Sequence, residues 1–306
     1  MILTITLNPS IDKSTLLKKI EPESKLRCAE VVNDPGGGGI NVSKALKKLG
    51  ADTIALFPAG GHNGNMLRSL LDEQGLEYHG VDTKVETREN WVVLETEKNH
   101  QFRFTFPGRE VQESTIITLI DQISNFSPSI VVASGSLPPG LPDHFYGLIV
   151  KKATAVGARC IVDTSGPALA ALKGKGTYLI KPNSSELSKL LNVPSLKKDD
   201  IDDAAQQIIR DGYAEIVAVS MGAEGAWLIT KDEKYFAAAP AVEKRSTVGA
   251  GDSMVAGITF MLQQHRSLKE AISFGVACGS AATMNEGTQL FKKEDAEYLY
   301  QQILKY

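Results

Sequence analysis

A chain of 306 residues with 42% hydrophobic and 23% charged side chains is long enough to bury a large core in one domain. Its 33 basic and 36 acidic residues give a net charge of -3, so no overall field favours nucleic acid or an anionic membrane surface. Cys28, Cys160 and Cys278 are far apart and form no C-x-x-C motif, which excludes a disulfide framework or zinc knuckle. Residues 1–8 enter a β-like run without a basic segment and long apolar core, and no later segment has the roughly 18 uncharged apolar residues of a membrane span. We therefore expect a soluble, unexported protein of the reducing cytoplasm.

Short apolar runs predict buried strands, most of them parallel, at residues 2–7, 53–57, 130–133, 160–162, 178–180 and 216–219. Segments of helical periodicity alternate with them or follow them, at residues 41–49, 66–74, 144–155, 202–211, 254–282 and 293–304. This alternation predicts a doubly wound, mostly parallel α/β sheet in a single domain, residues 1–306. Ligands should then bind at the carboxyl ends of the strands.

Two polar-alternating stretches, residues 13–32 and 89–106, interrupt this rhythm and predict antiparallel strands with one exposed face. We interpret them as a small β-sheet lid, formed by about residues 12–34 and 88–107 and inserted in the same domain. Alternating apolar side chains would share one face of this lid and need covering: Trp91, Val93, Phe102 and Phe104. We therefore expect a homodimer joined through the lids.

Four successive glycines, Gly36 to Gly39, precede a predicted helix and would let a ligand lie against bare backbone, with the amide of Asn41 nearby. In isolation the run is equally compatible with a flexible loop. It is not a Walker loop, and it lacks the spacing of a dinucleotide fingerprint. An NAD-linked oxidoreductase on a doubly wound sheet is therefore a weak alternative.

Four cationic side chains lie near these glycines in sequence or on the predicted lid: Lys25, Arg27, Arg88 and Arg103. Any one of them alone is more typical of a solvated surface residue. Convergence of three or four would bind a sugar phosphate, because guanidinium groups match phosphate oxygens and lysine adds a mobile charge.

Two further motifs follow buried strands in the second half of the chain. Asn183 and Glu186 stand one turn apart at the start of a predicted helix. That spacing suits a hydrated Mg²⁺ ion, and it suits equally a helix start at which Glu186 favours the helix dipole. The segment from Ser220 to Gly225 predicts a loop against a nucleotide, although alone it is only a turn.

The stretch from Ser246 to Ser253 contains two glycines directly before Asp252, at the start of an apolar helical run. Gly249 and Gly251 allow successive N–H groups to converge on one anion at the helix N-terminus, and Asp252 would lie beside that anion. From spacing alone, an N-cap is the commoner role of such an aspartate, ahead of catalysis.

Six motifs in this order resemble the PfkB branch of the ribokinase-like superfamily, and the match spans nearly the whole chain: Asn8-Pro9-Ser10-Ile11-Asp12, residues 36–42, Thr87-Arg88, residues 134–140, residues 181–186 and residues 247–253. The resemblance implies a ribokinase-like fold and an ATP-dependent sugar kinase. It gives Asp252 the role of catalytic base, and gives the amides of Gly249, Ala250 and Gly251 the role of stabilising the transferring phosphoryl group.

The resemblance also implies which residues bind the ligands. At the sugar it places Asp12, Gly36, Gly37, Asn41, Arg88 and Ser136. At the nucleotide it places Lys181, Asn183, Ser220, Met221, Gly222, Ala223, Glu224, Gly225 and Lys244, with Mg²⁺ held partly through water by Asn183 and Glu186. It implies a K⁺ site near Ser246, Val248, Ala282, Asn285, Gly287 and Gln289.

The preferred sugar phosphate is indicated by one position at which this chain differs from related kinases. Fructose-1-phosphate and tagatose-6-phosphate kinases of this branch carry a lysine where this chain has Gly38. With Lys25 and Arg27, the chain is most similar to the 6-phosphofructokinases of the family, which phosphorylate the C1 hydroxyl of fructose 6-phosphate in glycolysis. The alternatives are the other two kinases and a catalytically idle sugar-phosphate sensor. Glu21 replaces the aromatic residue that helps a second ATP to inhibit such enzymes, so we do not expect the same inhibition here.

Overall fold

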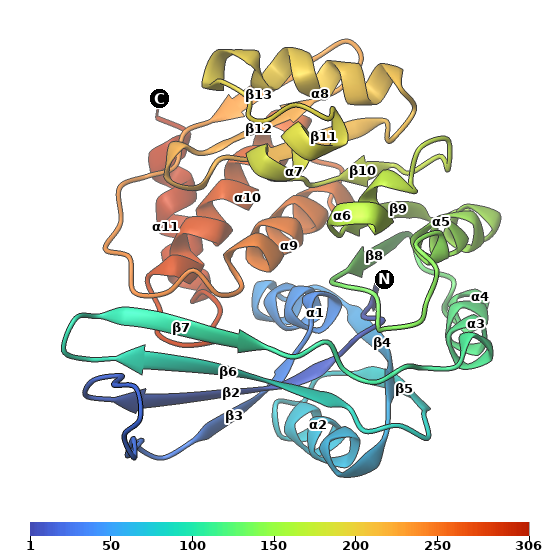
Figure 1. The fold of residues 1–306 in the computed structure, drawn as a ribbon. Coiled ribbons are helices and arrows are strands. Elements are labelled where there is room, and N and C mark those ends of the chain that lie inside the picture. Colours follow the sequence, from blue (N-terminus) through green and yellow to red (C-terminus); the bar gives the residue numbers. More distant parts are fainter. Residues whose placement is uncertain (306) are drawn as a thin grey trace.

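The computed structural model describes residues 1–305, in which a nine-stranded sheet lies beside a four-stranded sheet (Figure 1). The order in the larger sheet is β13-β12-β11-β10-β9-β8-β1-β4-β5. Its parallel strands are β1 Ile2–Ile5, β4 Thr53–Ala59, β5 Tyr78–Asp82, β8 Ile130–Ser134, β9 Arg159–Asp163, β10 Leu179–Ile180 and β11 Ile216–Ser220. Two strands, β12 Ala226–Ile229 and β13 Lys234–Ala237, extend one edge in antiparallel pairing.

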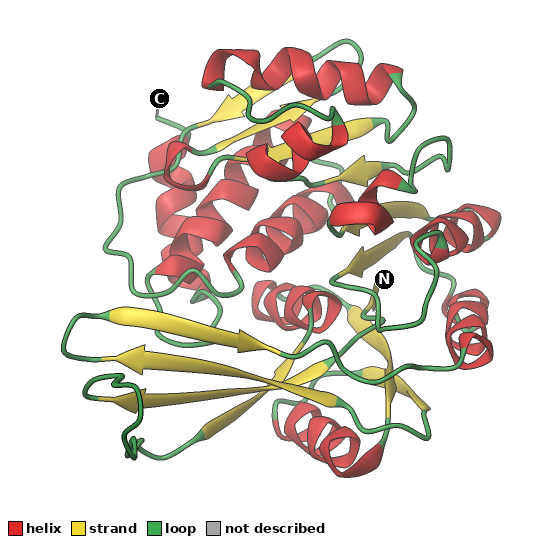
Figure 2. Ribbon diagram, in the orientation of Figure 1, coloured by secondary structure: helices red, strands yellow, loops and turns green. Residues whose placement is uncertain are grey.

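Helices cover both faces of the larger sheet (Figure 2). One face packs against α1 Gly38–Leu49, α9 Ala250–Gln263, α10 Leu268–Thr283 and α11 Lys293–Ile303. The other packs against α3 Glu113–Asp121, α4 Ile123–Phe126, α5 Phe145–Ala155, α6 Gly166–Ala170, α7 Ser184–Leu190 and α8 Ile201–Arg210. The predicted doubly wound α/β sheet is confirmed. Within the described chain, no helix is both long and apolar enough to cross a bilayer.

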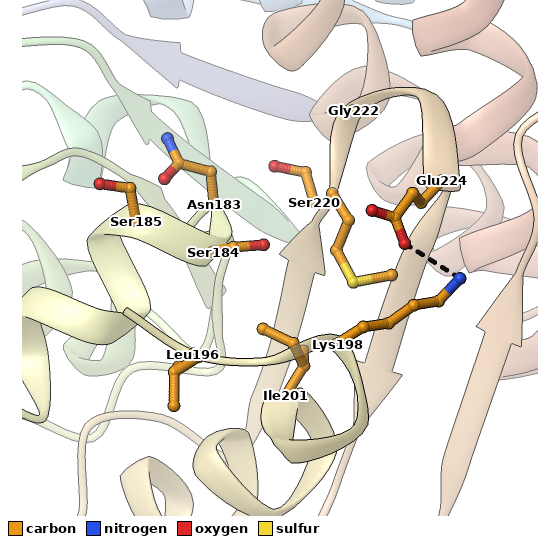
Figure 3. A pocket seen from close by; sticks show the side chains of 10 residues that line it. Asn183, Ser184, Ser185, Leu196, Lys198, Ile201, Ser220, Gly222 and Glu224 are labelled. Atoms are coloured by element: carbon orange, nitrogen blue, oxygen red, sulfur yellow. Dashed lines mark ion pairs between the residues drawn. The ribbon is translucent and has the colours of Figure 1, made fainter. Parts of the chain in front are cut away.

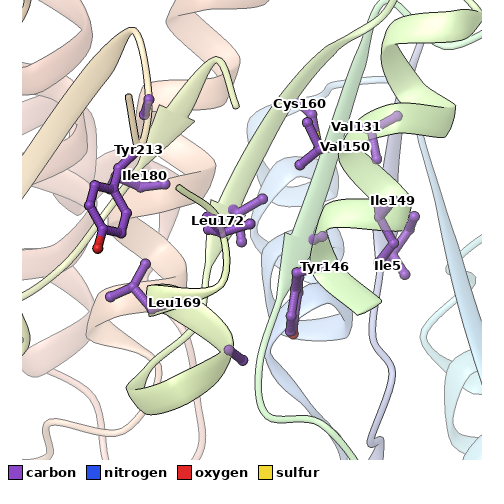
Figure 4. Packing of buried hydrophobic residues seen from close by; sticks show 14 of the residues in the cluster. Ile5, Val131, Tyr146, Ile149, Val150, Cys160, Leu169, Leu172, Ile180 and Tyr213 are labelled. Carbon is purple, nitrogen blue, oxygen red and sulfur yellow. The ribbon is translucent and has the colours of Figure 1, made fainter. Parts of the chain in front are cut away.

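The continuous apolar runs arise because neighbouring residues of one strand are buried on opposite faces of the sheet. In β8, Val131 and Ala133 belong to the core cluster on the α5 side, whereas Ile130 and Val132 belong to the cluster beneath α9. Figure 4 shows part of the first cluster, where Val131 lies near Ile149 and Val150 of α5. Strands buried on both faces cannot alternate with polar residues, so their sequence signature is unbroken.

The smaller sheet has the order β3-β2-β6-β7, formed by β2 Ser10–Leu17, β3 Val32–Gly36, β6 Arg88–Glu95 and β7 His100–Thr105. Helix α2, Gly61–Glu73, packs against its β2 and β3. Two expectations about this lid were wrong. Residues 18–31 form an irregular loop instead of continuing a strand, and β2 pairs with β6 in parallel, while the β2–β3 and β6–β7 pairs are antiparallel.

The lid register confirms that the predicted apolar side chains share one face, since Trp91 is opposite Phe104 and Val93 is opposite Phe102. Their exposure differs from the expectation. Phe104 is 49% exposed, but Val93 is only 8% exposed, so the expected exposed face is partly covered within the chain itself.

The sequence prediction did not name strands β5, β12 and β13, helices α3, α4 and α6, or the break between α9 and α10. β5 is polar and contains a glycine, and β12 and β13 are only four residues long, which is too short for periodicity to be distinctive. The predicted helical run over residues 254–282 is two helices. They separate before Ser267, which begins α10 through a capping box with Glu270.

Candidate active site

Asp252 is the third residue of α9 and lies where that helix meets the carboxyl ends of the central strands. The N-cap of α9 is Gly249, and no side chain caps this end of the helix, so the N-cap alternative for Asp252 is wrong. Its Oδ2 accepts a hydrogen bond from Asn41 Nδ2 at 3.0 Å, and its Oδ1 accepts one from Ser134 Oγ at 3.5 Å. Two remote segments therefore orient one carboxylate.

The pKa of the Asp252 carboxyl group is raised toward neutral pH. Burial and, next to it, the nearby carboxylate of Asp163 together raise its pKa to about 6, against the lowering effects of Asn41 and Lys181. A carboxylate with a pKa near the working pH is suited to accept a proton from a hydroxyl group.

The backbone before Asp252 has the geometry of an anion site. Gly249 adopts a left-handed φ of 72°, which turns the chain into α9. The first N–H groups of this helix have no partner four residues earlier and carry the positive end of its dipole. A cation lies beside them, since a Cβ placed on Gly251 would be 3.7 Å from Lys181 Nζ.

Lys181 is held by Asp163, a residue that the sequence analysis did not single out. The Lys181 Nζ to Asp163 Oδ1 distance is 3.3 Å, and the two side chains are 7% and 15% exposed. Burial lowers the pKa of Lys181, but Asp163, Glu186 and Asp252 outweigh it and hold that pKa above its ordinary value. Asp163 ends β9, so the rule that ligands gather at strand carboxyl ends would have found it.

Replacing Asp163 with asparagine should move the acid limb of activity to lower pH. Asp163 raises the pKa of Asp252, so its neutralisation lowers that pKa and keeps the base ionised further into acid. The measurement is the pH profile of kcat/KM for both proteins; ionisation of the substrate affects both equally. An unchanged limb, or a shift to higher pH, would refute the coupling.

On the lid side, Asp12 Oδ1 accepts hydrogen bonds from Ser10 Oγ at 2.7 Å and from Asn90 Nδ2 at 2.9 Å. Asn90 was also missed, because nothing in its sequence context distinguishes it. Gly36 leaves the space that the Asp12 carboxylate occupies, since a Cβ there would overlap it. The expected sugar residues Asp12 and Gly36 therefore lie in direct contact.

The glycine run is not a flexible loop. Gly38 and Gly39 begin α1, and a Cβ on Gly39 would overlap the backbone of Ile5. A Cβ on Gly38 would overlap the hydroxyl of Ser134 and lie 2.8 Å from Gly135 N. The glycines are needed because α1 starts directly against β1 and β8.

The other expected sugar residues differ in position. Ser136 Oγ accepts a hydrogen bond from Asn8 Nδ2 at 3.3 Å. Asn8 lies after β1, four residues before Asp12 in the chain. Arg88 donates to the backbone oxygens of Asn8 at 3.0 and 3.2 Å and of Phe106 at 2.9 Å, so its guanidinium joins the lid to β1. Arg103 Nη2 donates to Thr247 Oγ1 at 2.6 Å, which ties the lid to the segment before Asp252.

Lys25 and Arg27 are not brought to this site. Both are exposed in the loop of residues 18–31, at the outer end of the lid (Figure 1). Within one chain the four cations therefore do not converge: Arg88 contacts Asn8 and Phe106, and Arg103 contacts Thr247. Lys244 is likewise exposed, in the loop before α9.

A cavity of about 370 Å³ lies between the start of α7 and the loop after β11 (Figure 3). Asn183 lines it on one side, and the predicted nucleotide loop contributes Ser220, Met221, Gly222 and Glu224. Lys198, which the sequence analysis missed, pairs with Glu224 at 2.9 Å on its rim. The cavity is of a size that accepts a small organic group.

Asn183 and Glu186 form a capping box. Asn183 Oδ1 accepts from Glu186 N at 2.9 Å, and Glu186 Oε2 accepts from Asn183 N at 2.8 Å. The helix-start alternative is thus realised in the structure. Each side chain uses one oxygen in the box, and Glu186 retains Oε1. Within residues 1–305, no group of three or more His, Cys, Asp or Glu side chains could hold a metal directly.

The two segments expected around K⁺ lie side by side. Ser246 Oγ donates to the backbone oxygen of Gly287 at 2.9 Å, and the amides of Arg245 and Ser246 donate to Thr283 O. Asn285 Nδ2 donates to Ala281 O at 3.0 Å. These bonds hold the segment before α9 against the chain from Ala281 to Gly287, and Val248 N also donates to Ser246 Oγ at 3.2 Å. The remaining expected residues, Ala282 and Gln289, belong to the end of α10 and to the loop after it.

Comparison with known proteins identifies the family. The model of the pfkB family carbohydrate kinases matches residues 4–295. The chain belongs to this family. It is 43% identical over 301 residues to ATP-dependent 6-phosphofructokinase isozyme 2 of Escherichia coli, covering 98% of this chain and 97% of that protein.

Solved structures of pfkB family members agree with this fold. The crystal structure of phosphofructokinase-2 from Escherichia coli with fructose-6-phosphate has a TM-score of 0.93 and 41% identity, and the one with potassium has 0.95 and 42%; each match covers 99% of both chains. Ribokinase of Arabidopsis thaliana, 18% identical over 98% of both chains, has a TM-score of 0.76, which shows the ribokinase-like fold alone.

Proposed function

We propose that the chain is an ATP-dependent 6-phosphofructokinase, which transfers a phosphoryl group from ATP to the C1 hydroxyl of fructose 6-phosphate. The observation that carries the chemistry is the half-buried, doubly hydrogen-bonded carboxylate of Asp252 behind the Gly249 turn. The choice of sugar is supported by the 43% identity to the Escherichia coli isozyme, which has been crystallised with fructose-6-phosphate.

In this proposal Asp252 accepts the proton of the C1 hydroxyl, and Asn41 keeps the carboxylate in place. The amides of Gly249, Ala250 and Gly251, with the Lys181 ammonium next to them, stabilise the charge that develops on the transferring group. Arg103 and Asp12 belong to the lid side, where the sugar would be held and water excluded.

Mg²⁺ fits the site as an ion held through water. Asn183 lines the 370 Å³ cavity, and its one side-chain oxygen, which caps α7, has a second lone pair for a water ligand. Glu186, three residues further along α7, keeps Oε1 outside the capping box. When bound, Mg²⁺ neutralises charge on phosphate oxygens. We place the nucleotide base in that cavity, against the loop from Ser220 to Gly225, with Lys244 in the segment that leads to α9.

K⁺ fits the oxygen atoms of the two segments that meet at Ser246 and Gly287. The Escherichia coli enzyme has been crystallised with potassium. In this chain the bond from Ser246 to Gly287 lies three residues before the turn at Gly249. We propose that K⁺ there stabilises the backbone that carries the anion site.

Gly38 favours fructose 6-phosphate over the substrates of the related kinases. A lysine at this position would bring its Cβ onto Ser134 and Gly135 N, so this backbone does not accommodate the lysine typical of fructose-1-phosphate and tagatose-6-phosphate kinases. Those two activities are the alternatives within the enzyme class.

Product analysis tests the proposal. Incubation with ATP, Mg²⁺ and fructose 6-phosphate should yield ADP and fructose 1,6-bisphosphate in equal amounts. ADP without the bisphosphate would indicate hydrolysis of ATP by water. Absence of ADP with all three sugar phosphates would favour the idle sensor.

We also propose a homodimer joined through the lids. Phe104, on the face shared with Trp91, is 49% exposed, and large exposed apolar side chains on a sheet are typical of contact surfaces. Phe104→Asp should convert a dimer into a monomer at micromolar concentration, measured by light scattering. Tyr298→Asp is the matched control, because Tyr298 is 64% exposed on α11, beside Phe260 and Phe274 of the larger sheet's helices α9 and α10. A wild-type monomer, or a Phe104→Asp dimer, would contradict the proposal.

A further inference from the structure

A second cavity, of about 460 Å³, lies between α1, the chain after α2 and the segment before α11. Its charged lining consists of Lys44, Lys47 and Lys48 of α1 and of Asp34 of β3, which gives a net charge of +2. Asp252 is not among its lining residues. The proposed catalytic chemistry leaves this cavity unexplained.

The three ammonium groups donate to backbone oxygens and to no carboxylate. Lys44 Nζ donates to Pro35 O at 3.2 Å and Lys48 Nζ to Phe291 O at 3.1 Å, while Lys47 Nζ donates to Gln74 O at 2.9 Å. Within residues 1–305, none of the three lies within 4.0 Å of a carboxylate oxygen. Their positive charge is therefore not neutralised by direct ion pairs.

The remaining surroundings compensate this charge only in part. Asp34 Oδ2 accepts a hydrogen bond from Thr288 Oγ1 at 2.5 Å, so part of this carboxylate is already engaged. Burial lowers the pKa of Lys44, although Asp34, Asp12 and Asp252 oppose that effect. Burial and the neighbouring Lys292 lower the pKa of Lys48. Protonated lysines held close together in this way are stabilised by an added anion.

We propose that this cavity binds a phosphate-bearing anion that carries more than one negative charge. Lysine ammonium groups on one helix face bind phosphate oxygens as mobile point charges. Three such groups repel one another and are each attracted to an anion placed among them. The volume exceeds that of a single phosphate and lies within the range of small-ligand sites.

The position of Lys44 would connect this ligand to the catalytic side. Lys44 lies between the cavity and the carboxylates of Asp12 and Asp252, which act on it electrostatically. Gln289, at the cavity wall, belongs to the segment that also carries Gly287. A bound anion would thus change the field at Asp252 and restrain the loop behind it, so the cavity is placed to regulate the enzyme.

Calorimetric titration with inorganic pyrophosphate, without Mg²⁺ and at low salt, tests the site. Fructose 6-phosphate and ADP are left out, because both are phosphate-bearing anions that would compete for this cavity. We expect a pyrophosphate site whose affinity falls as salt is added, and the cavity variants separate it from any pyrophosphate bound at the proposed catalytic site. In the Lys47→Gln, Lys48→Gln double variant the affinity should fall about tenfold or more.

The matched control is Lys151→Gln, which removes an exposed helical lysine of α5 and should leave the affinity unchanged. Both cavity lysines of the double variant are exposed, and equal melting temperatures would verify that it folds. Inorganic phosphate serves as a second probe, and weaker binding of it than of pyrophosphate supports a multivalent ligand. Equal pyrophosphate affinity in all proteins, or no binding to the wild type, would overturn the proposal.

Discussion

Replacing Asp252 with asparagine should lower kcat by about 10²- to 10⁴-fold, the typical contribution of a positioned general base. Asparagine keeps the size of the side chain and an oxygen for Asn41 Nδ2, which now donates at 3.0 Å, but it cannot accept the substrate proton. The dissociation constant of fructose 6-phosphate should therefore stay close to the wild-type value. The measurements are the initial rate of ADP release and calorimetric binding of the sugar phosphate.

Asp232→Asn is the control for this substitution, since it makes the same chemical change at an exposed position in the turn after β12. It should retain wild-type turnover. If Asp252→Asn turned over at the wild-type rate, another group would be the base. If it lost sugar binding together with turnover, Asp252 would be a binding residue instead.

Gly249→Ala should lower kcat by about 10²- to 10³-fold, comparable to the loss of one donor from a preorganised anion site. Gly249 has a φ of 72°, and a Cβ there would lie 2.7 Å from Leu290 Cδ2. Leu290 is only 3% exposed and has little room to yield, so the contact and the left-handed backbone together should displace the turn and the amides that follow it. Since these amides act mainly on the transition state, kcat should fall more than the affinity for the sugar.

Gly50→Ala separates this effect from backbone strain. Gly50 ends α1 with a φ of 86°, and no atom lies within 4 Å of a Cβ placed there. The substitution should cost about 1 kcal/mol of stability through its left-handed backbone, with little change in kcat. An equal loss of activity in both variants would mean that strain alone explains the result, and the anion site would lose its support.

The central sheet could be predicted from the sequence because strands such as β8 bury both faces and so have an unbroken apolar pattern. The lid was harder. Its loop of residues 18–31 has the same mixed polarity as β2, and the direction of pairing between β2 and β6 depends on contacts across about 80 positions of chain. Local patterns do not contain that information.

Local sequence patterns were also insufficient to assign roles in the active site. From spacing alone, Asp252 was compatible with capping a helix, and the pair of Asn183 and Glu186 with a helix start at which Glu186 favours the dipole. The structure separates them, because Asn183 caps α7 with Glu186, whereas α9 is capped by Gly249 and leaves Asp252 free to face Asn41. Asp163 was missed because it ends β9, whereas its partner Lys181 directly follows β10. Only the parallel pairing of these two strands brings the two side chains together.

The most direct test of the central claim is the comparison of kcat/KM for fructose 6-phosphate, tagatose 6-phosphate and fructose 1-phosphate, from initial rates of ADP release with ATP and Mg²⁺. The account predicts the highest value for fructose 6-phosphate, because Gly38 leaves no room for the lysine of the related kinases. A higher value for either other sugar phosphate, or no activity with any of the three, would contradict the assignment as a 6-phosphofructokinase.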